Sequence, residues 1–200
     1  MSEQNISFIA HHILKGGVAL YPTDTLYALG SSIFDENAVR KVFEIKKRPL
    51  SNPLPIAVSD FEMLERVAYV DDKAMRLADF FLPGKLTLVL KKKDAVSDVV
   101  TAGGDKVAVR IPGNKVALEL LSRFGGPITA TSANVHGMKT PSVINEIRMQ
   151  FKNQGISVYL DTGRVAGKPS TVVDVTGETV RVIRVGEITE KEILDVIQHG

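Results

Sequence analysis

The chain has 200 residues, a formal net charge of +2 and a hydrophobic content of 44%. This length suits one domain, and so small a charge does not by itself indicate a nucleic-acid-binding protein. The absence of cysteine excludes disulfides and thiolate metal sites, and no apolar run approaches the ~20 residues of a membrane span. Because the first residues also lack the order of a secretory signal, we expect a cytoplasmic protein with no membrane segment.

Helical and extended segments alternate through most of the chain. Asp35, Asp60 and Asp71 are predicted N-caps, and Thr189 is a predicted cap for the last helix. In chain order, we predict a helix over 6–15, a strand over 18–21, a helix from 35 to about 47, a strand over 56–58, helices from 60 and 71, strands over 86–90 and 107–111, a helix over 115–124, a strand over 128–130, a helix over 141–151, strands near 156–160, 171–175 and 180–185, and a helix after 189. This pattern predicts one α/β domain over 1–200 with a mixed sheet, whose final strands pair antiparallel.

Several common signatures are missing. No GxGxxG follows a strand, and the stretch 163–170 (GRVAGKPS) only approaches GxxxxGK[ST], so we interpret it as a flexible loop. The four histidines show no metal-ligand spacing. The candidate carboxylates, Asp24, Asp161 and Asp174, form no pair typical of acid–base hydrolysis.

Polar residues flank the ends of four predicted strands, where open α/β sheets bind ligands. The segments are 21–25 (YPTDT), 110–114 (RIPGN), 129–134 (TATSAN) and 170–171 (ST). Loop capping explains any one of them, but four beside arginines suit a phosphate or carboxylate ligand. Basic clusters at 46–48 and 91–93 would add to an anion site if they converge. Such a site works by charge stabilisation and positioning, as phosphoryl and nucleotidyl transfer require.

Seven segments occur in the order seen in one family. They are 21–30 (YPTDTLYALG), 46–52 (KKRPLSN), 82–87 (LPGKLT), 107–112 (VAVRIP), 130–137 (ATSANVHG), 170–174 (STVVD) and 184–186 (RVG). In these segments, which lie between about residues 10 and 187, the chain resembles the YrdC-type threonylcarbamoyl-AMP synthases. The resemblance implies a YrdC/RibB-like fold, which is a single α/β domain with a twisted mixed sheet and helices around a concave basic cavity.

The resemblance also implies an activity. L-threonine, bicarbonate or CO2, and ATP with Mg²⁺ would yield threonylcarbamoyl-AMP and pyrophosphate, which makes the enzyme a nucleotidyltransferase. A separate tRNA threonylcarbamoyltransferase would then modify the adenosine beside the anticodon of tRNA. Direct binding of tRNA by this chain stays open.

Roles for individual residues follow from the same resemblance. The implied catalytic residues are Lys46, Arg48 and Arg110; the implied threonine-binding residues are Thr25, Arg110, Ala130 and Ser170; and the implied nucleotide-binding residues are Arg48, Asn52, Lys106, Ser132, Thr140 and Arg184. No protein-bound metal site is implied, and Asp24 is expected to orient its loop rather than act as a base. Ala28 and Ala57 depart from the family pattern, and we expect no second C-terminal domain.

Two other functions remain open from the sequence. A non-catalytic RNA-binding module would use the basic concave surface to grip the phosphates of tRNA or structured rRNA. However, aromatic residues make up only 6% of the chain, and none is interleaved with basic residues as base stacking favours. A carbamoyl-transfer domain like that of hydrogenase maturation proteins is less consistent, since those long chains carry cysteine-rich zinc modules.

Overall fold

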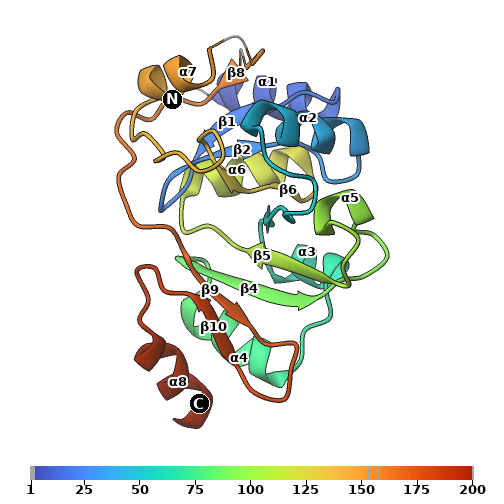
Figure 1. Cartoon of the computed structure of the whole chain (residues 1–200), viewed down its shortest axis with the longest axis vertical. Coiled ribbons are helices and arrows are strands. Elements are labelled where there is room, and N and C mark those ends of the chain that lie inside the picture. Colours follow the sequence, from blue (N-terminus) through green and yellow to red (C-terminus); the bar gives the residue numbers. More distant parts are fainter. Residues whose placement is uncertain (1–2, 153, 157, 200) are drawn as a thin grey trace.

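The computed structural model describes residues 3–152, 154–156 and 158–199. Helices and strands alternate along most of the chain (Figure 1). The elements are α1 (Glu3–Leu14), β1 (Ala19–Pro22), β2 (Tyr27–Gly30), α2 (Glu36–Lys46), β3 (Ile56–Ala57), α3 (Phe61–Val67), α4 (Asp72–Phe81), β4 (Leu86–Lys91), α5 (Asp98–Thr101), β5 (Lys106–Arg110), α6 (Lys115–Phe124), β6 (Ile128–Thr129), β7 (Thr131–Ser132), α7 (Ile144–Gln150), β8 (Val158–Tyr159), β9 (Thr171–Asp174), β10 (Arg181–Arg184) and α8 (Glu190–His199). Among these helices, none is long and apolar enough to cross a membrane.

The predicted helix caps are confirmed. Asp35, Asp60 and Asp71 each accept a hydrogen bond from the backbone N–H three residues on, at 3.0, 2.8 and 2.9 Å. At the last helix, Thr189 N donates to Glu192 Oε2 at 2.8 Å, and Glu192 N donates back to Thr189 Oγ1 at 3.3 Å. This reciprocal pair is a capping box, which fixes where α8 begins.

The α/β class and the mixed pairing are confirmed, but the prediction of one sheet is wrong. The strands form a four-stranded sheet in the order β7-β2-β1-β8 and a six-stranded sheet in the order β10-β9-β4-β5-β3-β6. The chain leaves one sheet for the other at Ala130, between β6 and β7. The predicted strand over 128–130 corresponds to β6, whereas β7 and β2 are not among the predicted strands.

The final strands follow the prediction only in part. β9 and β10 pair antiparallel as expected, but β8 pairs parallel with β1 in the other sheet. The predicted strand near 156–160 is therefore not part of the same sheet, and its residue 157 lies outside the described residues. The loop 163–170, predicted from its composition, has no regular structure and connects the two sheets.

Apolar packing ties each sheet to its helices. α1 and α6 lie side by side over the four-stranded sheet (Figure 1) and bury residues such as Ile13, Leu120 and Tyr21 in one cluster. α4 and α8 pack together at the far end of the molecule, where α4 also contacts β4. The larger cluster includes residues of both sheets, such as Leu29 and Leu88. The junction between the sheets is therefore held by a continuous core.

The C-terminal end of α6 offers a test of local stability. Gly125 caps this helix with φ +76°, and a Cβ built on it would meet no atom within 4 Å. Gly125→Ala is therefore expected to lower the free energy of unfolding by about 1 kcal/mol through the left-handed backbone alone. Thermal denaturation should show a fall in melting temperature of about 2–4 °C, and an unchanged melting temperature would contradict this account of the cap.

Candidate active site

Arg110, the last residue of β5, holds the loop before β2. Its Nη1 donates to Thr25 Oγ1 at 3.0 Å, and its Nη2 donates to Asp24 Oδ1 at 2.7 Å and to Gly84 O at 3.1 Å. Thr23 Oγ1 lies 3.0 Å from Thr25 Oγ1 and accepts from the backbone N–H of Thr25. The contact joins the two sheets, because Arg110 belongs to the six-stranded one and the loop leads into the four-stranded one.

The Arg110–Asp24 ion pair is buried and only partly satisfied. The side chains are 6% and 10% exposed. Burial lowers the pKa of Arg110, while the charges of Asp24 and Tyr21 act in the opposite direction. Arg110 Nε and Asp24 Oδ2 are buried without a hydrogen-bond partner. Buried polar atoms are rarely left without partners, because each costs about 1–3 kcal/mol, so both atoms have unused hydrogen-bonding capacity in this structure.

Arg184 lies close enough to Arg110 for their charges to interact, and it holds Ser170 by hydrogen bonds. Ser170 Oγ lies 2.7 Å from Thr87 Oγ1, and Arg184 donates to Ser170 O through Nε at 3.1 Å and Nη2 at 2.8 Å. Burial, and then the positive charge of Arg110, lower the pKa of Arg184. Two guanidinium groups therefore act on each other here, which favours an anion between them. We call Thr25, Arg110, Ser170 and Arg184 the arginine group.

The loop 163–170 passes close to the arginine group. A Cβ added at Gly167 would lie 2.7 Å from the backbone oxygen of Thr25. Since backbone atoms cannot give way easily, glycine is needed for this approach. The start of the loop is held by Tyr27, whose hydroxyl donates to Gly163 O at 2.8 Å and accepts from Thr162 N at 3.0 Å.

A second set of cations lies at the C-terminal end of α2. Lys46 is 1% exposed, and its Nζ donates to Asn134 O at 2.8 Å, to Asn134 Oδ1 at 3.3 Å and to Ser132 O. Arg48 is half-buried and donates to Asn52 O and Pro53 O, both at 3.0 Å. We call Lys46, Arg48, Ser132 and Asn134 the lysine group.

Burial sets the electrostatics of the lysine group. Burial, and then the charge of Arg48, lower the pKa of Lys46 from 10.5 to about 7. Burial also lowers the pKa of Arg48. No carboxylate of the described residues forms an ion pair with either side chain. Uncompensated cations of this kind attract an anion.

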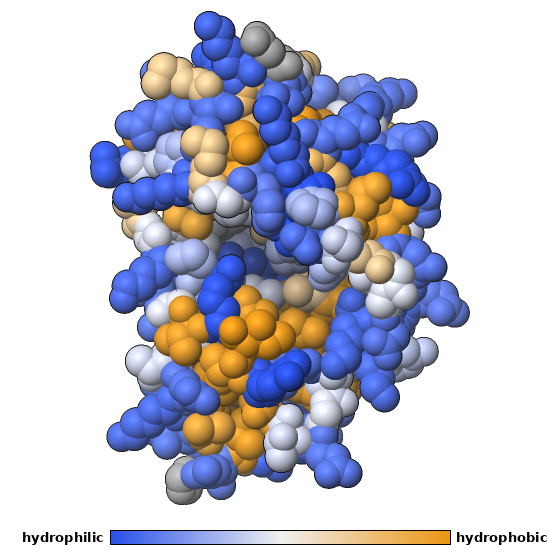
Figure 2. All heavy atoms as spheres, viewed as in Figure 1, coloured by the Kyte–Doolittle hydropathy of each residue, from blue (hydrophilic) through white to orange (hydrophobic). Residues whose placement is uncertain are grey.

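Backbone pairing connects the two groups. β2 follows directly from the Thr25 loop and pairs antiparallel with β7, placing Ala28 opposite Ser132. Ala133 N donates to Tyr27 O at 2.8 Å, and Ala130 N donates to Pro55 O at 2.8 Å. Figure 2 shows a recess across the middle of the molecule, between the part that holds β1, β2 and α6 and the part that holds β4, β9 and β10 (Figure 1). A basic lining for such a concave surface stays a prediction.

Comparison with known proteins identifies the family. Residues 11–186 match the Sua5/YciO/YrdC family model, described as "Telomere recombination". The chain belongs to the Sua5/YciO/YrdC family. The family that the sequence segments resembled is thereby confirmed.

Members of the Sua5/YciO/YrdC family from two organisms are similar over most of the chain. The threonylcarbamoyl-AMP synthase of Pyrococcus abyssi is 40% identical over 199 residues, which are 98% of this chain and 58% of that protein. The crystal structure of P. abyssi Sua5 complexed with L-threonine matches with a TM-score of 0.94 over 98% of this chain and 58% of that one, at 40% identity. The crystal structure of Escherichia coli YciO matches with a TM-score of 0.88 at 31% identity, over 96% of this chain and 94% of that one. The chain thus spans little more than half of the P. abyssi protein.

Within the Sua5/YciO/YrdC fold, most of the predicted site residues come together. Thr25, Arg110, Ser170 and Arg184 form one group, and Lys46, Arg48 and Ser132 belong to the other. Asn52 contacts Arg48 through its backbone oxygen, and Ala130 is tied to Pro55 between the sheets. Arg184, predicted for the nucleotide, lies beside the predicted threonine ligands Ser170 and Arg110. The ligands themselves stay predictions.

Two predicted residues are not drawn into either group. Lys106 begins β5 while Arg110 ends it, and Lys106 Nζ pairs with Asp174 Oδ2 at 3.1 Å. A strand rises about 3.3 Å per residue, so the two side chains start roughly 13 Å apart. Thr140 is half-buried in the loop between β7 and α7, and among the described residues it makes no hydrogen bond to either group. Both nucleotide-binding roles stay predictions.

Asn134 and Thr87 were missing from the predicted site residues, and Asp24 was predicted only to orient its loop. Asn134 accepts from the Ser132 hydroxyl and from Lys46, and its Nδ2 donates to Met138 O at 2.7 Å. Thr87 partners Ser170, and Asp24 partners Arg110. All three lie inside the seven segments that carried the resemblance. Their positions were therefore visible in the sequence, but their partners depend on tertiary contacts.

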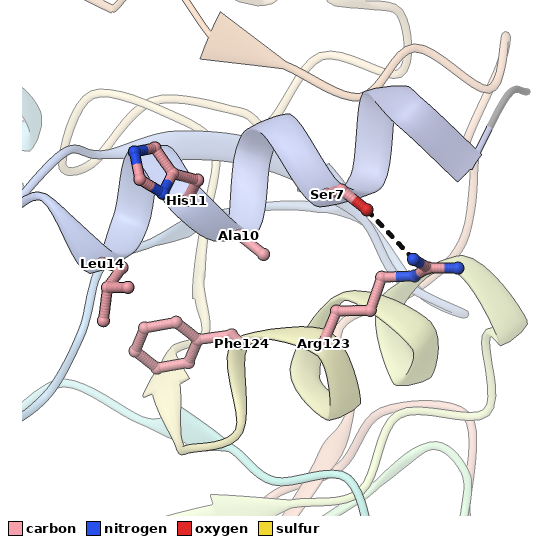
Figure 3. Close-up of a pocket in the computed structure, with 6 residues that line it drawn as sticks. All are labelled: Ser7, Ala10, His11, Leu14, Arg123 and Phe124. Atoms are coloured by element: carbon pink, nitrogen blue, oxygen red, sulfur yellow. Dashed lines mark hydrogen bonds between the residues drawn. The ribbon is translucent and has the colours of Figure 1, made fainter.

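A surface pocket of about 300 Å³ lies away from both groups, between α1 and α6. Figure 3 shows that Leu14 and Phe124 lie on one side of it and that Arg123 Nη1 donates to Ser7 Oγ at 3.0 Å on the other. This hydrogen bond joins the two helices, so the packing of α1 against α6 accounts for the pocket.

Across the described residues, no three His, Asp or Glu side chains are grouped as metal ligands.

Proposed function

We propose that this chain is a threonylcarbamoyl-AMP synthase. The observation that carries the proposal is the 40% identity over 98% of the chain to the P. abyssi protein of that name, whose structure was solved with L-threonine. Two sets of cations, one around the buried Arg110 and one around the buried Lys46, support it, because the reaction uses a carboxylate-bearing amino acid and a polyphosphate. The product would serve threonylcarbamoyl modification of tRNA.

The arginine group is suited to threonine. Arg110 would bind the threonine carboxylate with the donors that its contacts to Asp24 and Thr25 leave free. Thr25 and Ser170 offer hydroxyl groups, and the backbone at Ala130 offers a further polar contact. Arg184 lies between this end and the nucleotide in the proposed complex, where the carbamate and the α-phosphate would meet.

The lysine group is suited to ATP. Arg48 would contact the phosphates, with Asn52, Ser132 and Thr140 beside it. Mg²⁺ would be held chiefly by the phosphates themselves, since it commonly takes only one or two protein carboxylates, and Asp24 is engaged with Arg110. Bound there, it would neutralise part of the phosphate charge.

The proposed chemistry has two steps. The threonine amine and bicarbonate form a carbamate and water. A carbamate oxygen then bonds to the α-phosphorus of ATP while the bond from that phosphorus to the bridging oxygen breaks, and pyrophosphate leaves in line. Negative charge builds on the phosphate oxygens, so the role of Arg48 and Arg184 is to stabilise it. The product would pass to a separate tRNA threonylcarbamoyltransferase.

Pyrophosphate release tests the proposal. With ATP, Mg²⁺, L-threonine and bicarbonate all present, we expect steady release, and omission of threonine or bicarbonate should abolish it. Turnover that ignores threonine would contradict the proposal. A plain RNA-binding protein would instead show no turnover and bind tRNA with an affinity that falls steeply with salt.

A further inference from the structure

Lys46 has no donor left for a ligand. An ammonium group carries three N–H donors and no acceptor. The oxygen atoms around Nζ are Ser132 O, Asn134 O at 2.8 Å and Asn134 Oδ1 at 3.3 Å, one for each donor. With the side chain 1% exposed, a phosphate cannot reach the nitrogen unless this set of contacts is broken.

The backbone of Lys46 contacts the same stretch of chain as its side chain does, residues 132–136. His136 N donates to Lys46 O at 2.7 Å, so both ends of the residue contact 132–136. Within the segment, the Ser132 hydroxyl donates to Asn134 Oδ1, and Asn134 Nδ2 donates to Val135 O and Met138 O at 2.9 and 2.7 Å. We call residues 132–138 the Asn134 loop. The loop is built around Asn134, and Lys46 joins it to the end of α2.

We propose that Lys46 is a positioning residue, which acts on the nucleotide through the Asn134 loop rather than by touching the phosphates. This inference rests on the proposed function, because it takes ATP as the ligand of the lysine group. It departs from the role that the family resemblance implied, in which Lys46 stands with Arg48 at the phosphates.

Protonation of Lys46 would control the loop. The amine form has two N–H donors instead of three, so one of the contacts to the Asn134 loop is lost when the group deprotonates. The lowered pKa, about 7, sets that change near neutral pH. The charge that acts on the ammonium is that of Arg48; His136, the titratable residue of the loop, contacts Lys46 through the backbone. Because burial is the main cause of the lowered pKa, opening the loop would return the pKa toward 10.5, and relief of the buried charge outweighs the lost contact. The opened loop therefore binds more protons than the closed one, and opening becomes less favourable as pH rises above about 7.

Lys46→Met separates positioning from direct contact. A hydrogen bond to a charged group contributes about 1.5–3 kcal/mol, so we expect the variant to raise the KM for ATP roughly tenfold or more. The KM for threonine should stay unchanged, whereas a merely structural loss would lower active enzyme without moving either KM. Amide hydrogen exchange over the Asn134 loop should quicken by a similar factor. Lys41→Met is the matched control, since Lys41 lies on the same helix and donates to Gly16 O at 3.2 Å.

Positioning through the loop and direct contact with the phosphates predict different outcomes for Lys46→Met. A raised KM for ATP with unchanged exchange over 132–138 would mean direct contact and would overturn the positioning role; faster exchange with an unchanged KM would also overturn it. If the wild-type chain shows no threonine-dependent turnover, the proposed function fails, and ATP binding by calorimetry replaces the KM. Should Lys46→Met not fold, wild-type exchange decides. Corrected for intrinsic rates, exchange over the loop should slow above about pH 7, relative to α6, and a constant ratio would overturn the role.

Discussion

Replacing Arg110 with alanine is expected to lower threonine-dependent pyrophosphate release by about 10²–10³. Arg110 is the group that would bind the threonine carboxylate, and its free donors are fixed in place by contacts to Asp24 and Thr25. The loss should fall on kcat/KM for threonine, with the KM for ATP changed far less. Steady-state kinetics with each substrate varied in turn measure this difference.

Stability complicates the Arg110→Ala variant. Removing one partner of a buried ion pair costs about 3–5 kcal/mol, because the other charge is left uncompensated. In Arg110→Ala, that charge is Asp24, whose side chain is only 10% exposed. The matched control is the double variant Asp24→Asn/Arg110→Ala, which removes both charges. We expect it to regain much of the melting temperature and none of the activity; near-normal pyrophosphate release from the double variant would contradict the role of Arg110.

The sequence predicted local structure better than the division into sheets. Helix caps such as Asp35 and Asp71 depend on a few neighbouring residues, and α6 was predicted with the bounds it has, 115–124. The crossing at Ala130 depends on which distant strands pair with the two residues on each side. A two-residue strand carries no periodicity, so neither β7 nor the second sheet could be predicted from the pattern.

For the candidate site too, the sequence predicted the local features better than the long-range ones. The positions of Thr25, Arg48, Arg110 and Ser170 could be predicted because each lies in a recognisable segment. The partners could not, since Arg110 meets Asp24 across 86 positions of the chain and Lys46 meets Asn134 across 88. The burial of Lys46, which decides between direct contact and positioning, is likewise a product of the tertiary fold.

Arg48→Ala is the second substitution with a large expected effect. Arg48 would stabilise charge on the phosphates, and the loss of one preorganised donor typically costs about 10²–10³ in rate. For Arg48→Ala, kcat/KM for ATP should fall while the KM for threonine stays unchanged, which is the opposite of the result for Arg110→Ala. Only two side-chain hydrogen bonds are lost, to Asn52 O and Pro53 O, so the change in melting temperature should be modest.

Arg40→Ala is the matched control for Arg48→Ala. Arg40 lies on α2 with its side chain 48% exposed, 3.9 Å from Glu36, and its removal should change neither KM. Arg48→Ala should also act on Lys46, because the charge of Arg48 contributes to lowering the Lys46 pKa. Without it, this pKa rises, and the pH-dependent change in exchange over the Asn134 loop moves to higher pH. A variant that keeps normal turnover would contradict the phosphate role, whereas one that loses turnover without moving the pH dependence of the loop would show that the two cations act independently.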